Sequence, residues 1–292
     1  MEDVHAFAHH AMATEFKISL ATPEFKQAEI AAQTVFEHID ALENTLSRFR
    51  PDSDISRINR MKDGQSLPVE YETWHVLKIA FEMQQLTDGR FDCGLAQYMD
   101  VFRKIKEGLL ESSHFDYAIA KVHREKQSSA FFIDPDEAVI HCVRHGMYFD
   151  LGGIGKGFAL DECRRLLLKM GFDTFKLNAG ESTRLFQSKT ADFWHYQLEG
   201  MSTEELATPK EICISASGTG FQGQHIFDPK TGSNRKQLYD RTWVATYSAA
   251  YSDALSTASF LVEEATLENW VQENDQILWI AFLKNEKLHW IK

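Results

Sequence analysis

The spacing of apolar residues predicts four long helices. Residues 24–46 and 69–86 carry apolar side chains at every third or fourth position, which is typical of helices with one buried face. Residues 160–170 and 248–262 show the same period. Thr87-Asp88-Gly89 and Gly171 are suited to end two of these helices. We expect the inward side chains of the first two helices to be Ala28, Ala31, Val35, Ile39, Leu42 and Leu46, and Trp74, Leu77, Phe81 and Leu86.

Short apolar or alternating stretches predict strands between the helices. They are residues 15–20, 130–133, 139–142, 147–150, 175–178, 193–198, 211–215 and 242–246. Residues 276–283 and 287–291 predict a closing hairpin with a three-residue connection around Asn285. Because strands and helices do not alternate regularly, we expect an α+β architecture in which helices pack on a largely antiparallel sheet.

Composition and charge exclude several classes of protein. The chain has 292 residues, enough for one large domain or two small ones, and a net charge of −12. This acidity argues against nucleic acid as a partner, although a local pocket or a divalent cation can still hold a phosphorylated ligand. No apolar run is long enough to cross a membrane.

Cysteine usage and the first residues indicate where the protein works. The four cysteines fit neither a zinc signature nor a disulfide framework, so we expect buried thiols. Residues 1–5 have neither the basic region nor the apolar core of a signal peptide. We therefore expect a cytoplasmic protein, or an exported periplasmic lipoprotein if a leader has been removed.

A glycine-rich turn at residues 148–157 is the strongest candidate site. An apolar run ends at Asp150, and glycines then surround Lys156 immediately before a helical pattern. Exposed backbone amides and a helix N-terminus favour a phosphorylated ligand, with or without a metal. The turn is not a P-loop, because Gly157 stands where serine or threonine would bind magnesium.

A second candidate lies on the last predicted helix. Asp253, Ser256 and Thr257 are three and four positions apart, so their oxygens share one flank of the helix. A carboxylate with hydroxyls is a set of hard oxygen ligands suited to Mg²⁺. The same residues also fit a hydrogen-bonded helix face in the interior, and the spacing alone favours that second interpretation.

Two glycine-containing segments lie between residues 218 and 232. His225 precedes a compact turn, Asp228-Pro229, and could act as a general base or make only a structural hydrogen bond. Residues 218–223 spell GxGxxG, but a dinucleotide site needs a helix directly afterwards. Residues 224–229 indicate a strand and a turn instead, which argues against a nicotinamide dehydrogenase.

Two N-terminal segments offer apolar surface for a planar ring. Met12 lies in residues 11–14, and Phe49 lies in a polar loop at residues 46–59. Within that loop, residues 51–54 are suited to cap a short helix. Packing in the core or the loop is the alternative use of both side chains.

The order of these segments resembles that of the ApbE-type flavin transferases, the FAD:protein FMN transferases. The resemblance runs from Met12 to about Val262. The motifs that carry it are residues 11–14, 47–59, 91–94, 150–161, 178–181, 216–218, 225–232 and 253–258. It implies a single ApbE-like, T-fold-related domain over residues 1–292, with room for a smaller inserted subdomain around residues 95–145.

The resemblance also implies an activity. Such enzymes bind FAD, cleave its pyrophosphate with Mg²⁺, and attach FMN through a phosphoester bond to a threonine or serine of a flavoprotein acceptor, releasing AMP. The FAD contacts would be Met12, Phe49, Cys93, Gly94, Leu95, Asp150, Lys156, His225 and Ile226. The Mg²⁺ ligands would be the main-chain oxygen of Gly153 with Asp253, Ser256 and Thr257. His225 would deprotonate the attacking hydroxyl, with Asp253 and Lys156 as the other catalytic residues.

The chain departs from the family pattern on the flavin or acceptor side. Phe49 replaces a tyrosine, Cys93 and Gly94 replace proline and threonine, and Glu181 replaces a glycine. A usual tryptophan-containing segment is not recognisable at residues 98–104. Two alternatives therefore stay open: an FAD pyrophosphatase that releases FMN and AMP to water, and a non-catalytic FAD-binding protein.

Overall fold

The computed structural model describes residues 3–198, 206–218, 228–230 and 238–292. The chain divides into two compact units. The first contains residues 1–43, 154–221 and 237–292, and the second contains residues 44–153 and 222–236. A single domain with an inserted part around residues 95–145 stays a prediction.

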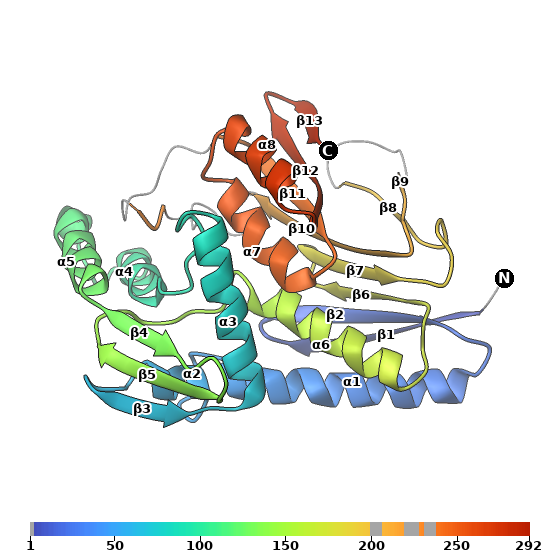
Figure 1. Cartoon of the computed structure of the whole chain (residues 1–292), viewed down its shortest axis with the longest axis horizontal. Helices are drawn as coiled ribbons and strands as arrows, with labels where there is room; N and C mark the ends of the chain where they lie inside the picture. The colour runs from blue at the N-terminus through green and yellow to red at the C-terminus, as the bar shows by residue number, and fades with distance from the viewer. Residues whose placement is uncertain (1–2, 199–205, 219–227, 231–237) are drawn as a thin grey trace. The chain divides into compact units, whose positions relative to one another are not determined.

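One eight-stranded antiparallel sheet forms the centre of the first unit (Figure 1). Its spatial order is β1-β2-β6-β7-β10-β11-β12-β13, and every neighbouring pair is antiparallel. The strands are β1 Val4–Ala11, β2 Thr14–Ala21, β6 Phe175–Ala179, β7 Thr183–Gln187, β10 Glu211–Gly218, β11 Arg241–Thr246, β12 Ile277–Lys284 and β13 Lys287–Ile291. This confirms the predicted α+β class with a largely antiparallel sheet.

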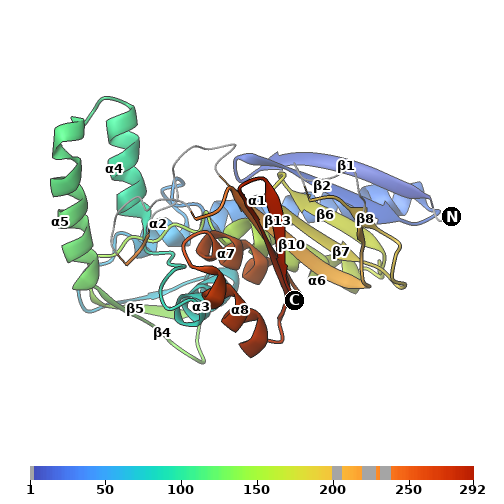
Figure 2. The same cartoon turned by 90° about the horizontal axis from the view of Figure 1, so that it is seen from above.

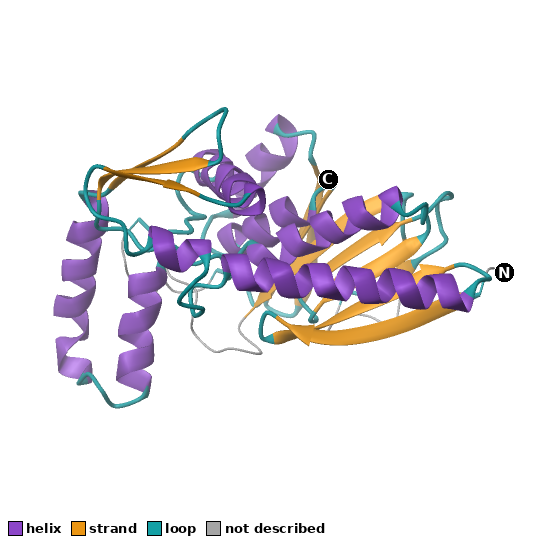
Figure 3. Ribbon diagram, turned by 90° about the horizontal axis from the view of Figure 1, so that it is seen from below, coloured by secondary structure: helices purple, strands orange, loops and turns teal. Residues whose placement is uncertain are grey.

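Helices cover one face of this sheet (Figure 3). They are α6 Gly155–Lys169, α7 Ala249–Ser259 and the start of α1 Phe25–Leu46, with α8 Glu264–Glu273 beside β12. The predicted inward residues of α1 are all buried, at 5% exposure or less. The residues of β7, β10 and β11 that point away from α7 form a second apolar cluster, which includes Phe186, Ile214 and Trp243. A short ribbon of β8 His195–Tyr196 and β9 Leu206–Ala207 contributes to that cluster.

The second unit combines a small sheet with helices. Its sheet has the order β3-β5-β4, formed by β3 Gln65–Pro68, β4 Ala130–Ile133 and β5 Val139–Arg144. Its helices are α2 Asp54–Ile58, α3 Tyr71–Leu86, α4 Ala96–Lys106 and α5 Phe115–Gln127, with a short 3₁₀ turn at Ser112–His114. Helices α4 and α5 lie side by side as an antiparallel pair (Figure 2) around Tyr98, Val101, Ile119 and Val122.

The structure corrects some expected elements. Residues 147–150 are not a strand, because their backbone bonds to loops and to a side chain: Tyr148 accepts from the Ala96 N–H and Asp150 donates to the Cys93 carbonyl. The C-terminal hairpin has a two-residue turn, Asn285-Glu286, with φ of 51° and 62°, in place of three residues. Of the predicted inward residues of α3, Leu77 is buried while Trp74, Phe81 and Leu86 are only partly buried.

The first strand and its turn were not expected. Strand β1 pairs with β2 through a tight turn formed by Met12 and Ala13, which have φ of 48° and 57°. Both residues carry side chains in the left-handed region that glycine normally occupies. Among the described residues, no helix combines the length and the apolar character needed to cross a membrane.

Candidate functional site

Helices α6 and α7 approach each other closely at Gly157. A Cβ atom on this glycine would overlap the carbonyl oxygen of Ala249 and lie 2.8 Å from the backbone nitrogen of Ala250. The glycine therefore permits a backbone contact that no side chain would allow. Helix α6 begins at Gly155, within the glycine-rich turn, five residues earlier than predicted.

This close approach places the Asp253 carboxylate beside the start of α6. Oδ2 of Asp253 accepts a hydrogen bond from the Gly157 N–H at 3.1 Å and lies 4.0 Å from Nζ of Lys156. The hydroxyl of Thr183, on β7, donates to Oδ1 at 3.3 Å. Asp253 is 5% exposed. The carboxylate is therefore buried with an ammonium, an amide and a hydroxyl around it, an arrangement that fits both a cation site and a hydrogen-bonded helix face in the interior.

Hydroxyl groups extend the site along α7. The Ser256 and Thr257 hydroxyls lie 2.9 Å and 3.4 Å from the Asp253 carbonyl oxygen. Ser217 of β10 reaches both residues, with its Oγ 2.9 Å from Ser256 Oγ and 3.5 Å from Thr257 Oγ1. The sheet thus fixes the side-chain positions of two predicted Mg²⁺ ligands.

Asp161 on α6 fixes the start of α7. Its carboxylate accepts hydrogen bonds from the backbone N–H groups of Ala249 and Ala250, at 3.0 Å and 2.9 Å, and from the Ser248 hydroxyl at 2.7 Å. Burial raises the pKa of Asp161, while Arg164 and these donors act in the opposite direction. Asp161 therefore sets the position of the helix that carries Asp253.

In the second unit, the loop after α1 is tied to the start of the glycine-rich turn. The side chain of Asn59 donates to the Phe149 carbonyl at 3.0 Å and accepts from the Phe149 N–H at 2.7 Å. Arg48 forms ion pairs with Asp150 and, at 3.2 Å, with Asp100. Ser53 caps α2 by accepting from the Ser56 N–H, as residues 51–54 predicted. Asp150 thus has a fixed position within this unit.

The predicted flavin contacts of the second unit lie around the same turn. Phe49 is 69% exposed, and the Arg48 guanidinium stacks 4.3 Å from its ring centre. Cys93 is buried, and burial raises the pKa of its thiol well above the usual range, so this group is not a nucleophile. Gly94 leaves space that Met147 fills, because a Cβ there would overlap the Met147 sulfur. Leu95 precedes α4 as its N-cap.

Three further predicted residues lie in the first unit or outside the described part. Met12 occupies the tip of the β1–β2 hairpin, and its neighbour Thr14 packs against Gly180. His225 and Ile226 lie outside the described residues, as does most of the GxGxxG segment. Of the His225 motif, the structure describes residues 228–230, where Asp228, which is 1% exposed, accepts from Arg90 at 2.7 Å.

The structure therefore groups the predicted residues in two sets. Asp253, Lys156, Ser256 and Thr257 lie together in the first unit. Asp150, Cys93 and Phe49 lie around Arg48 and the turn in the second unit, to which Gly153 also belongs.

Sequence reasoning missed several residues that complete these sets. Thr183, Ser217 and Arg48 act through partners far away in the chain. Arg48 and Ser217 lie within the motifs at residues 47–59 and 216–218, but those motifs gave them no role, and no local pattern marks Thr183. Asp161 is the last residue of the motif at residues 150–161, and this position was the only available signal for it.

The donor atoms of the first set fit a hard divalent cation. Carboxylate, hydroxyl and carbonyl oxygens are the ligands that Mg²⁺ selects, and Mg²⁺ usually completes its shell with water and phosphate oxygens. Within the described ranges, no cluster of three or more His, Cys, Asp or Glu side chains offers a metal site of another kind.

Comparison with known proteins adds independent information. Residues 12–280 match the ApbE family. The chain is 25% identical to the FAD:protein FMN transferase of Chlamydia trachomatis, over 83% of this chain and 78% of that protein. It is 22% identical to the FAD:protein FMN transferase of Vibrio cholerae, over 90% of this chain and 82% of that protein.

Solved structures share the same fold. The apo flavinyl transferase ApbE of Pseudomonas stutzeri superimposes with a TM-score of 0.84 at 20% identity, covering 100% of this chain and 96% of that one. The flavin transferase ApbE of Vibrio cholerae gives a TM-score of 0.79 at 18% identity, over 99% of this chain and 97% of that one. The architecture described above is therefore an ApbE-like architecture.

Proposed function

This chain belongs to the ApbE family of flavin transferases, and we propose that it is a Mg²⁺-dependent enzyme that binds FAD, cleaves its pyrophosphate and attaches FMN to a threonine or serine of an acceptor flavoprotein, releasing AMP. The observation that carries the proposal is the convergence of Asp253, Lys156 and the Gly157 amide at the junction of α6 and α7. Attack on a diphosphate requires such a concentration of cation-binding oxygens and positive charge.

We propose the following roles for residues of the first unit. Asp253, with the Ser256 and Thr257 hydroxyls, would hold Mg²⁺. The main-chain carbonyl of Gly153, which belongs to the second unit, stays a predicted further ligand. When bound, the ion neutralises charge on the diphosphate and on the departing phosphate. Lys156 supplies a second positive charge at the same place. The Gly157 amide and the Thr183 hydroxyl keep the carboxylate oriented.

His225 is the proposed base, which would take the proton from the attacking hydroxyl. A base of this kind contributes about 10²–10⁴-fold to a rate. Asp228, three residues after it, bonds to Arg90.

The flavin would be held by the second group of residues. Phe49 presents an exposed aromatic ring, stiffened by the stacked Arg48. Met12, Cys93, Gly94, Leu95, Asp150 and Ile226 are proposed as the other contacts.

The test is incubation of the protein with FAD, Mg²⁺ and a threonine-bearing acceptor, followed by mass spectrometry of the acceptor and quantification of AMP. We expect AMP and flavinylated acceptor in equal amounts. Retention of FAD with neither product, at saturating Mg²⁺, would contradict the proposal and favour a non-catalytic FAD-binding protein.

A second candidate function is FAD pyrophosphatase activity. It is favoured by the departures on the flavin side, namely Phe49, Cys93, Gly94 and Glu181. In that case FMN and AMP would accumulate at the same rate with and without acceptor, and no acceptor would be labelled.

A further inference from the structure

Strand β1 leaves one edge of the eight-stranded sheet open. It ends the strand order, with β2 as its neighbour (Figure 2). The Thr22 N–H donates to the Asp3 carbonyl at 2.9 Å, and the register of β1 with β2 repeats this kind of pair at every second residue. The odd-numbered residues of β1 therefore bond to β2, and the even-numbered residues direct their backbone N–H and C=O groups outward. Among the described residues these outward groups have no hydrogen-bond partner; they belong to Val4, Ala6, Ala8 and His10.

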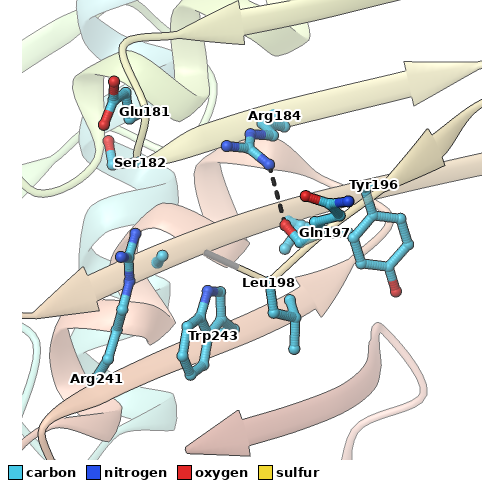
Figure 4. A pocket seen from close by; sticks show the side chains of 10 residues that line it. Glu181, Ser182, Arg184, Tyr196, Gln197, Leu198, Arg241 and Trp243 are labelled. Atoms are coloured by element: carbon cyan, nitrogen blue, oxygen red, sulfur yellow. Dashed lines mark hydrogen bonds between the residues drawn. The ribbon is translucent and has the colours of Figure 1, made fainter. Parts of the chain in front are cut away.

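The middle of the sheet, by contrast, is covered on the face that points away from α7. Tyr196 and Leu198 pack with Trp243 in one apolar cluster (Figure 4). Beside them, Arg184 of β7 donates to the Gln197 carbonyl at 3.3 Å. The side chains on this part of the sheet thus have partners within the chain, so the open part of the sheet is its β1 edge.

The opposite edge of the sheet is protected against pairing with another strand. Strand β13 has only five residues, begins with Lys287 and is followed by Lys292. Short length and lysine side chains are common ways in which proteins prevent pairing at a sheet edge. Strand β1 has eight residues and none of these features, since it contains no proline, lysine, arginine or acidic residue and its register with β2 has no bulge.

Apolar side chains lie exposed along the β1 edge. Val4 is 47% exposed, and Phe25 at the start of α1 is 53% exposed. The Phe25 ring lies 6.1 Å from the ring of Phe7. An open strand edge with exposed apolar side chains beside it is typical of a surface that another strand covers.

The sequence of β1 is suited to pair with a second copy of itself. Residues 5–9 read His-Ala-Phe-Ala-His in both directions. When two copies run antiparallel with Phe7 opposite Phe7, each Ala6 lies opposite Ala8 of the other copy. The outward backbone groups of the even-numbered residues then meet across the junction, as an antiparallel pair requires. The alternation of side chains between the two faces of the sheet also continues from one copy to the other.

The side chains at such a junction are compatible with one another. Phe7 would occupy a non-hydrogen-bonded pair, in which opposite side chains are closest and two aromatic rings interact favourably. The methyl groups of Ala6 and Ala8 are small enough for the strands to approach. Because β1 carries no acidic residue, two molecules with a net charge of −12 each can pair these strands without placing carboxylates opposite one another.

We propose that β1 pairs with β1 of a second copy of this chain, about a two-fold axis at Phe7, and joins two eight-stranded sheets into one. The paired residues are 4–10, so the hairpin tip at Met12 and Ala13 lies beyond them. This inference is independent of the proposed function, because it uses no residue of the candidate site.

Charge substitutions on β1 test both the dimer and its register. Sedimentation velocity is measured over a concentration series for the native chain, for Ala6→Lys/Ala8→Lys and for Ala6→Glu/Ala8→Glu. Each variant places like charges opposite each other in its own dimer, whereas a mixture of the two variants places opposite charges there. Residue 8 also lies opposite Lys17 of β2. The glutamate variant, which is compatible with Lys17, therefore guards against misfolding of the lysine variant.

We expect the native chain to sediment with twice the mass of one chain, and both variants to self-associate at least about tenfold more weakly. Mixing the two variants should restore the dimer. Ala265→Lys/Gln272→Lys, an equal charge change on exposed α8 surface, should leave the native dimer intact. A monomeric native chain, variants that dimerise as the native chain does, or a mixture that stays monomeric would each overturn the proposal.

Cysteine cross-linking tests the position of the two-fold axis. In the proposed register the Cα atoms of residue 7 in the two copies are about 4.5 Å apart, which is within the range of a disulfide. Those of residue 10 are about 20 Å apart along the strands. The four native cysteines are buried and should not compete. With a mild oxidant, we expect Phe7→Cys to give a covalent dimer that a reductant separates, and His10→Cys to give none. Equal cross-linking of the two variants, or cross-linking of His10→Cys alone, would overturn the proposed pairing.

Discussion

The surroundings of the Asp253 carboxylate depend on three polar neighbours and on the absence of a side chain at Gly157. The Gly157 amide, the Thr183 hydroxyl and Lys156 surround it. The amide and Lys156 lie there because α6 and α7 meet without a Cβ between them, whereas Thr183 reaches the carboxylate from the sheet. Because only a few atoms form the site, single substitutions should separate the roles of its residues.

Replacing Asp253 with Asn should remove the charge that Mg²⁺ needs while keeping the shape of the side chain. We expect AMP release from FAD to fall at least about 100-fold, and the Mg²⁺ concentration for half-maximal rate to rise. Steady-state kinetics across a Mg²⁺ titration measures both. Thr266→Val, on α8, is a control that should leave both values unchanged, and unaltered kinetics in Asp253→Asn would remove this residue from the mechanism.

Removing divalent ions tests the same predicted Mg²⁺ ligands without substituting any of them. We expect EDTA to abolish AMP release and added Mg²⁺ to restore it, because the donor set has no nitrogen or sulfur ligand that would retain a transition metal. Turnover that persists in excess EDTA would contradict the Mg²⁺ assignment.

Substituting Gly157 with Ala should force α6 and α7 apart. The added methyl group would overlap the Ala249 backbone, which cannot move away as a side chain could. Overpacking of this kind costs about 1–3 kcal/mol, and we expect the melting temperature to fall by at least about 3 °C. Gly152→Ala is the matched control, since its Cβ would approach only the Asp150 side chain, at 3.0 Å.

At the scale of elements, local pattern predicted the parts that bury a continuous face. The helix at residues 24–46, the Ser53 cap and the i, i+4 arrangement of Asp253 and Thr257 could all be derived from spacing. Strand β1 could not, because its inward positions alternate His5, Phe7 and His9, whose mixed character hides the period. Helices α4 and α5 were missed because few of their residues are buried.

Contacts between elements could not be predicted from the sequence, for a different reason. Thr183 and Ser217 reach α7 only because β7 and β10 are neighbours in the sheet. No sequence pattern near either residue indicates that these two strands are adjacent. The glycine-rich motif predicted a close backbone approach, but only the structure shows that α7 is the partner.

Asp161 connects two elements and should act through position alone. Asp161→Ala removes the acceptor for Ala249, Ala250 and Ser248, so we expect about 2–4 kcal/mol lower stability. The remaining folded protein should need more Mg²⁺ with little change in FAD affinity, because α7 shifts while the second unit does not. Denaturant unfolding and a Mg²⁺ titration measure the two effects. Asp161→Asn, which keeps one acceptor oxygen, should recover part of both, and full loss in Asp161→Asn would argue for a role of its charge.

At the scale of the whole molecule, basic residues gather on one sheet face although the protein as a whole is acidic. An acidic protein keeps Lys176, Arg184 and Arg241 together on one sheet face, and the pKa of Lys176 is lowered there by burial and by Arg184. A base whose pKa is lower in the folded state binds its proton less tightly there. Stability therefore rises as the pH increases through the folded pKa of Lys176.

Lys176→Met should for this reason stabilise the protein at neutral pH, with a melting temperature about 1–3 °C higher. The gain should shrink toward pH 10.5, where the native lysine also becomes neutral. Met keeps the apolar stem that lies over Phe186. Thermal melts at several pH values measure this, and a gain that is constant with pH would show that charge is not its source.

The hairpin tip at Met12 and Ala13 has a consequence for anyone who wishes to improve this protein. Two side-chain-bearing residues sit there in a left-handed conformation that costs about 1–2 kcal/mol each. Ala13→Gly would release part of that torsional energy and is an obvious thermostabilising change. Glycine would also allow the hairpin tip to adopt other conformations. A variant stabilised in this way should therefore bind FAD with lower affinity.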